Sequence, residues 1–164
     1  MSDELPSKSQ RKRDMHDLQT LGAELVELND DQLAAVDLPE LLLDAVQAAR
    51  GITKHEARRR QLQYIGKIMR HVDPEPIRAQ IAAWKAVSAA HTAQLHLVER
   101  WRDRLLLEEE AITQLANEYP DADVAQIRLL IRNAARERAS EQPPKSYRAL
   151  FKLLNEMIGK ARES

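Results

Sequence analysis

Residues 73–76 read Asp-Pro-Glu-Pro, and these two closely spaced prolines constrain the fold more than any other stretch of the chain. Proline breaks the interior of a helix, but it is tolerated in the first turn, where its missing N–H needs no partner. An aspartate directly before the first proline can cap the new helix. The sequence therefore predicts that one helix ends just before residue 73 and that another starts at about residue 74.

The second of these helices is predicted to reach about residue 107. Apolar side chains recur every seven residues from Ile77 to Leu105, although polar residues interrupt the seam and His91 lies on it. At about 1.5 Å per residue the helix would span ~50 Å, longer than a compact bundle of this size requires. We therefore expect an elongated protein in which long helices join two small helical bundles.

The rest of the chain also favours helices. Good helix formers dominate, aromatic residues make up only 4% of the chain, glycine occurs four times, and no alternating strand pattern stands out. The predicted fold class is all-α. We expect a flexible tail over residues 1–10, an N-terminal helical bundle over 11–90 and a C-terminal helical bundle over 91–164, with the long helix of about 74–107 shared between them.

Several shorter helices are expected around the long one. The first carries a leucine stripe and stops near residues 29–31, where Asp30 or Asp31 could cap a short turn. A helical pattern then runs from Pro39 to about residue 72, and Gly51 marks a point where it could kink or break. Beyond residue 107 we expect a helix that starts at Glu108–Glu110, another capped by Asp121 or Asp123, and a last one after residues 142–146.

Charge is distributed in blocks along the chain. The net charge is −1, yet residues 1–49 hold four basic and eleven acidic side chains, a net charge of −7. Residues 50–78 reach +5, with eight basic and three acidic side chains, and residues 128–162 reach +6, with nine and three. Separate basic faces on a neutral chain can bind phosphate locally, but the same blocks could instead pair with one another in the fold.

The basic block from Lys54 to Arg78 is periodic as a helix. At 100° per residue its cations gather on one side, and the opposite side is filled by Leu62, Ile65, Ile68, Met69 and Val72. Arg58 is the exception, because it projects into the middle of the apolar arc. We expect Arg58 either to pair with a carboxylate or carbonyl across a helix interface or to lie where the core has ended.

Exposed arginines on rigid helices suit phosphate oxygens, which a guanidinium binds with two donors at once. A solvated helix face is an equally good explanation of such runs. If they bind, the pattern indicates an acidic partner without distinguishing RNA from protein. Arg100 and Arg104 are further candidates, and Trp101 between them is better explained as core than as a base-stacking platform. The predicted binding residues are Arg59, Arg60, Lys67, Arg70, Arg128, Arg132 and Arg136.

Catalysis has little support in the sequence. The chain has no cysteine, no glycine-rich phosphate loop and no nucleophile elbow, so we expect neither an enzyme nor a cofactor. None of its five histidines is spaced by three or four from another, and His91 is better explained as a hydrogen-bonded core residue than as a metal ligand. The chain has no signal peptide and no apolar run of membrane-spanning length, so we expect a cytoplasmic protein with no membrane contact. We also expect no small-molecule substrate and no homo-oligomer.

Several stretches resemble one known family closely. Residues 58–70 read Arg-Arg-Arg-Gln-Leu-Gln-Tyr-Ile-Gly-Lys-Ile-Met-Arg, and residues 143–146 read Pro-Pro-Lys-Ser. Together with residues 7–9, 12–14, 21–28, 75–78, 102–105, 119–123 and 130–134, these stretches resemble the bacterial ribosome-associated DarP (YjgA) family in the same order and over nearly the whole chain.

The resemblance implies an all-α protein of two small helical bundles. It also implies that the protein joins late precursors of the large (50S) ribosomal subunit, contacts 23S ribosomal RNA and promotes maturation of the peptidyl transferase centre. The family has no catalytic motif that could be assigned to residues of this chain. A helical adaptor that binds an acidic protein is the alternative, and nuclease treatment would separate the two.

Overall fold

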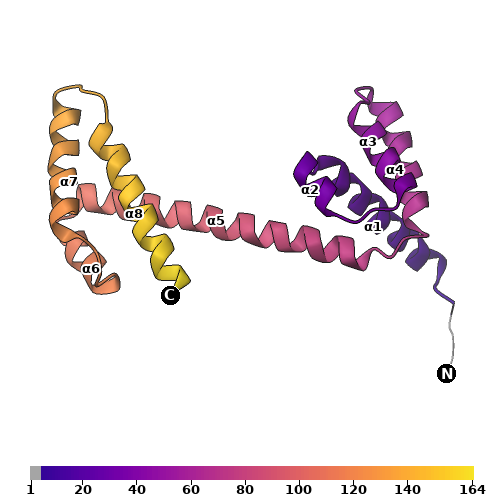
Figure 1. The fold of residues 1–164 in the computed structure, drawn as a ribbon, viewed down its shortest axis with the longest axis horizontal. Helices are drawn as coiled ribbons and strands as arrows, with labels where there is room; N and C mark the ends of the chain where they lie inside the picture. The colour runs from indigo at the N-terminus through magenta and orange to yellow at the C-terminus, as the bar shows by residue number, and fades with distance from the viewer. Residues whose placement is uncertain (1–4) are drawn as a thin grey trace. The chain divides into compact units, whose positions relative to one another are not determined.

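The computed structural model describes residues 5–164, and every regular element in that part of the chain is an α-helix (Figure 1). The all-α fold class is confirmed. The chain divides into two compact units, Met1–Trp84 and Lys85–Ser164, with the division inside α5. The helices are α1 (Lys8–Glu27), α2 (Asp30–Ala35), α3 (Glu40–Arg50), α4 (His55–Met69), α5 (Glu75–Leu107), α6 (Ala111–Glu118), α7 (Val124–Ala139) and α8 (Lys145–Glu163).

The first helix starts earlier than the sequence suggested. Ser7 caps it, and the Ser7 Oγ accepts a hydrogen bond from the Gln10 N–H at 3.2 Å. This cap satisfies one of the free N–H groups of the first turn. The last three residues of the expected tail, 8–10, are therefore helical, and residues 1–4 lie outside the described part of the chain.

The cap of α2 also differs from the expectation. Asn29, rather than Asp30 or Asp31, is the capping residue: its Oδ1 accepts from the Gln32 N–H at 2.8 Å, and its own N–H donates to Gln32 Oε1 at 3.2 Å. This reciprocal pair forms a capping box. The two aspartates occupy the first turn instead, where the helix dipole favours a negative charge.

The long pattern that starts at Pro39 breaks at Gly51. Gly51, Ile52 and Thr53 are three poor helix formers in succession, so α3 ends at Arg50 and α4 starts at His55. Arg50 holds the chain at this point, because its guanidinium donates to the Leu28 carbonyl and pairs with Asp30 Oδ1 at 2.6 Å. Gln61 in α4 donates to the Ala45 carbonyl at 2.9 Å, so the two halves of the pattern pack as neighbours.

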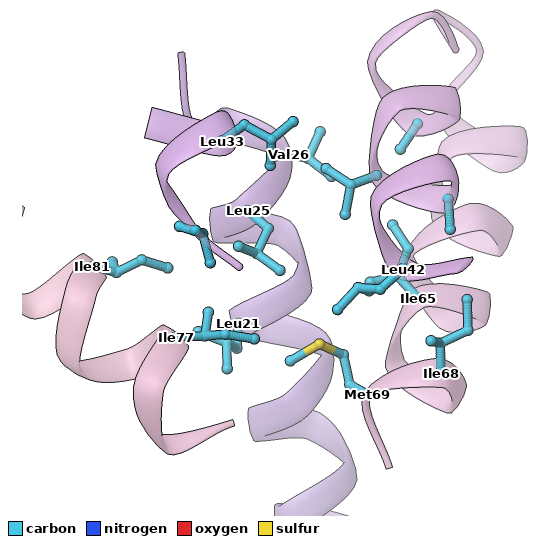
Figure 2. Close-up of a cluster of buried hydrophobic side chains, with 14 residues drawn as sticks. Leu21, Leu25, Val26, Leu33, Leu42, Ile65, Ile68, Met69, Ile77 and Ile81 are labelled. Carbon is cyan, nitrogen blue, oxygen red and sulfur yellow. The ribbon is translucent and has the colours of Figure 1, made fainter. Parts of the chain in front are cut away.

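Apolar side chains from α1 to α5 fill the core of the N-terminal unit. Figure 2 shows Ile77 and Ile81 of α5 beside Leu21 and Leu25 of α1, and Met69 of α4 reaching into the same interior. These side chains are at most 4% exposed. Burial of aliphatic side chains contributes about 1.5–3 kcal/mol each, so this cluster is the main source of stability in the unit.

The helix start predicted at Asp-Pro-Glu-Pro is confirmed. Asp73 Oδ1 accepts from the Glu75 N–H at 3.1 Å, and α5 then runs 33 residues to Leu107. The prediction of a buried His91 was wrong, because the side chain is exposed. No residue of α5 between Ala82 and Leu97 is buried, so the apolar seam loses its partner there.

The C-terminal unit has its own core, formed by the end of α5 with α6, α7 and α8. The predicted helix start at Glu108–Glu110 is confirmed at its last residue, because Glu110 is the N-cap of α6 and the helix starts at Ala111. The Glu108 N–H still bonds to the Arg104 carbonyl at 2.7 Å. Asp123 is the residue that caps α7. Glu137 of α7 accepts from the Ser146 N–H and Oγ–H at 2.9 and 2.8 Å, which ties α7 to the first turn of α8.

Candidate nucleic-acid interface

Helix α4 presents the first group of predicted binding residues to solvent. Its buried face consists of Ile65, Gly66, Ile68 and Met69, and this packing turns the opposite face outward. Arg59, Arg60, Lys67 and Arg70 are all exposed. We call these four residues the α4 anchor.

The α4 anchor is not electrically uniform. Arg59 lies 2.9 Å and Arg60 3.6 Å from the same carboxylate oxygen of Glu56, so the two guanidinium groups share one counter-charge. Each of these side chains is more than half exposed, and such surface pairs contribute only about 0–1 kcal/mol. An incoming phosphate can therefore displace Glu56 at little cost.

Arg58, which projects into the apolar arc, pairs across a helix interface. Its Nη2 lies 2.8 Å from Glu27 Oε1 at the end of α1, and its side chain is 34% exposed. The first of the two alternatives left by the sequence therefore holds. Arg58 therefore links α4 to the end of α1.

Lys67 and Arg70 lie at the other end of α4 and have no carboxylate partner among residues 5–164. Arg70 approaches the sulfur of Met15 in α1, and it borders a hollow of about 360 Å³ together with Arg11, Asp14, Met15 and Leu18. Arg11 also has no ion-pair partner among residues 5–164. Arg11 is not one of the binding residues predicted from the sequence.

Helix α7 carries the second group, Arg128, Arg132 and Arg136, which we call the α7 anchor. Ile127, Leu130 and Ala134 are buried on the other side of the helix. The three arginines are exposed, follow one another at intervals of four residues, and make no ion pair with any described side chain. One full turn with about 6 Å of rise separates each from the next, so they form a single row.

The other two arginine candidates of the C-terminal unit differ: Arg100 is exposed, whereas Arg104 is held by intramolecular contacts. Arg104 pairs with Glu108 at 3.4 Å, donates to Gln114 and lies over the ring of Trp101 at 4.8 Å. Trp101 is 4% exposed, so its interpretation as core is confirmed. The guanidinium carbon of Arg102 lies 4.2 Å from the centroid of the Tyr147 ring.

One hollow of the C-terminal unit is poorly suited to a polyanion. The hollow of about 410 Å³ between the end of α6 and the end of α8 is lined by Glu118, Asp121, Asp123 and Glu156, with Lys160 as the one basic side chain. Tyr119 lies in its wall, and burial together with the neighbouring Glu118 raises the pKa of this phenol above 10.0. Four carboxylates would repel a phosphate.

Metal-binding clusters and membrane-spanning helices are both absent from residues 5–164. No group of three or more histidine, aspartate or glutamate side chains within residues 5–164 is arranged to hold a metal ion. In the same part of the chain, no helix combines the length and the apolar character that crossing a membrane requires. The distinctive surface features are the two groups of cations.

The fold and these surfaces define an all-α protein with exposed basic faces on helices of both units. Comparison with known proteins identifies the family. The family model described as "Dual-action ribosomal maturation protein DarP" matches residues 4–155. The chain belongs to this DarP family of ribosomal maturation proteins.

Individual relatives agree with the family model. A dual-action ribosomal maturation protein DarP from Nitrosomonas eutropha is 52% identical over 153 residues, which cover 93% of this chain and 87% of that protein. The protein of the same name from Aromatoleum aromaticum is 51% identical over 152 residues, 93% of this chain and 80% of that one. The one from Nitrosomonas europaea is 50% identical over 157 residues, covering 96% and 88%.

Proposed function

We propose that this protein is a non-enzymatic assembly factor for the large (50S) ribosomal subunit. It binds 23S ribosomal RNA in late precursors and promotes maturation of the peptidyl transferase centre. The proposal follows from membership of the DarP family, whose name describes ribosomal maturation. The structural observation that carries it is the row of exposed arginines on α7, which have no carboxylate partner within the described residues.

The α4 anchor and the α7 anchor bind the RNA backbone in this proposal. A guanidinium donates two parallel hydrogen bonds to phosphate oxygens, and a helix holds several of them in fixed positions, so little entropy is lost on binding. Contacts to phosphate fix register and orientation without reading sequence. The protein would therefore recognise the shape of an RNA segment and hold it while the surrounding precursor matures.

The acidic blocks of the chain have a role in the same proposal. Residues 1–49 carry a net charge of −7, and residues 108–127 contain six carboxylates and no lysine or arginine. Negative surfaces beside basic ones limit nonspecific binding to other RNA, because like charges repel. Binding would then require a backbone geometry that reaches the anchors and avoids these carboxylates.

A helical adaptor that binds an acidic protein is the second candidate function. One observation favours it: Arg128 and Arg132 border a hollow of about 360 Å³ whose other walls include Leu105, Leu106 and Leu107, although Glu108 and Glu109 also line it. Leu107 is 81% exposed, and aliphatic walls beside cations suit an acidic amphipathic segment. An association with precursor particles that survives complete nuclease digestion would favour this candidate.

Charge reversal tests the proposal directly. The variant Arg59→Glu/Arg60→Glu is compared with wild type for cosedimentation with large-subunit precursor particles. We expect weaker cosedimentation, because the new carboxylates repel phosphate. We expect no lower Tm, because both positions are exposed. The matched control reverses the same number of charges at Arg138 and Lys160, which are exposed and lie outside both anchors. If the α4 variant cosediments as wild type does, the α4 anchor is not an RNA contact.

A further inference from the structure

We infer that Arg11 of α1 and Arg70 of α4 form one binding site for a phosphodiester group of RNA. The binding face of the N-terminal unit would then cross from α4 onto α1. This inference rests on the proposed function, because it takes the RNA backbone as the ligand. It adds Arg11, which no pattern in the sequence had marked as a binding residue.

The two guanidinium groups border one hollow of about 360 Å³ although they come from different helices. Their positions are set by the core. Met69, directly before Arg70, is fully buried, and Leu18, one turn beyond Met15 on α1, packs against the same core cluster. The packing of α1 on α4 therefore fixes the backbone positions from which Arg11 and Arg70 extend toward the hollow.

The charge of this pair is uncompensated in the part of the chain that the structure describes. Neither Arg11 nor Arg70 takes part in a salt bridge there. Asp14 borders the same hollow, but its Oδ1 accepts a hydrogen bond from Gln10 Nε2 at 2.8 Å and no ion pair joins it to either arginine. Arg59 and Arg60 differ in this respect, because they already share Glu56.

Two arginines that border one hollow from different helices suit a tetrahedral phosphate better than a planar carboxylate. Each can donate to a different pair of oxygens, whereas a carboxylate offers two oxygens in one plane. Lys67 lies one turn before Arg70, and Lys8 one turn before Arg11, so further cations flank the pair along both helices. Such a row fits successive phosphates of a strand, and this is why we assign RNA rather than an acidic protein.

A double-mutant cycle tests whether the two arginines share one ligand. Arg11→Gln, Arg70→Gln and the double variant are titrated with large-subunit precursor particles and measured by cosedimentation. We expect each single change to weaken binding about 10-fold. Because both side chains would hold the same phosphate, the double variant should lose far less than the product of the two single losses.

The matched control is Arg13→Gln, an equal loss of charge on the same exposed end of α1. Arg13 lies two residues from Arg11, or about 200° around the helix, and does not border the hollow. Its binding should stay within about 2-fold of wild type. Arg70→Lys keeps the charge but loses the guanidinium fork, including the Nε that contacts the Met15 sulfur. Because position 70 is exposed, this variant should bind more weakly than wild type with an unchanged Tm.

The outcomes separate this inference from the proposed function. If wild type does not bind the particles, or if binding survives nuclease, the proposed function fails and takes the inference with it. If wild-type binding depends on RNA but Arg11→Gln matches Arg13→Gln, only the shared site is wrong. Fully multiplicative losses in the double variant would also overturn it, since they would indicate two separate contacts.

Discussion

Gly22 of α1 lies against Ile65 of α4 so closely that a Cβ atom at position 22 would be 2.6 Å from Ile65 Cγ2. Ile65 is fully buried and branched at Cβ, so its methyl group cannot swing aside freely. This contact sets the distance between α1 and α4. The same helix pair positions Arg11 and Arg70 and carries the ion pair of Arg58 with Glu27.

Replacement of Gly22 by alanine should therefore destabilise the protein. Overpacking of a core costs about 1–3 kcal/mol, which exceeds the gain of about 1 kcal/mol that alanine brings to a helix over glycine. The control is Gly66→Ala on α4, where the new Cβ would lie 3.5 Å from Gln19 Cβ, an ordinary contact. Urea unfolding should show a loss for the first variant and none for the second. Equal stability of the two would contradict the proposed tight contact.

Arg50 should contribute more to stability than its exposed partner Asp30. Arg50→Ala leaves the Leu28 carbonyl without its side-chain donor, at a cost of about 1–3 kcal/mol. The Asp30 side chain is 96% exposed, so Asp30→Ala should cost much less. Thermal unfolding of the two variants measures the difference. Similar Tm values would mean that the carbonyl contact contributes nothing beyond the surface ion pair.

Acid should weaken the junction of α7 with α8. Hydrogen bonds from the Ser146 N–H and hydroxyl lower the pKa of Glu137 below 4.5. At a pH between the two pKa values of Glu137, the unfolded chain binds more protons than the folded protein. The stability that the Glu137–Ser146 hydrogen bonds contribute is therefore present above pH 4.5 and is lost as the pH falls through the folded pKa. Glu137→Gln should reduce the fall of Tm below pH 4.5, and an unchanged acid limb in this variant would contradict the assignment.

The two sides of α7 should differ in binding. Arg132 lies in the α7 anchor, whereas Arg138 is exposed outside it, in the last turn of the same helix. We expect Arg132→Ala to weaken binding to large-subunit precursors by about 3- to 10-fold, and Arg138→Ala to have little effect. The Tm of both should match wild type within a few degrees. Equal losses of binding would point to nonspecific attraction by net charge.

Local chemistry explains which parts of the fold could be predicted from the sequence. The two prolines and Asp73 mark the start of α5 unambiguously, because a proline pair fits only the first turn of a helix. The cap of α2 was harder to predict, because Asn29, Asp30 and Asp31 can all cap a helix. Asn29 is the cap because its backbone and side chain both hydrogen-bond to Gln32. The burial of His91 was mispredicted because a heptad pattern shows which side of a helix is apolar. It does not show whether another helix covers that side.

The candidate site was predictable only where it lies on one helix. The exposed rows on α4 and α7 follow from periodicity, and the shared contact of Arg59 and Arg60 with Glu56 follows from spacings of three and four. That Arg11 and Arg70 border one hollow depends on how α1 packs on α4. Gly22 and Gly66 are the one local signal of that close packing, and they do not reveal which side chains it brings together.

Salt dependence is the most direct test of the central claim that this protein binds ribosomal RNA through its exposed arginines. The apparent Kd for large-subunit precursor particles is measured over a series of salt concentrations, for wild type and for a variant in which Arg128 and Arg132 are replaced by glutamate. We predict that log affinity falls linearly with log salt for wild type, and that the slope is shallower for the variant because fewer phosphates are neutralised. An affinity that does not change with salt, or that persists after nuclease digestion, would contradict the claim.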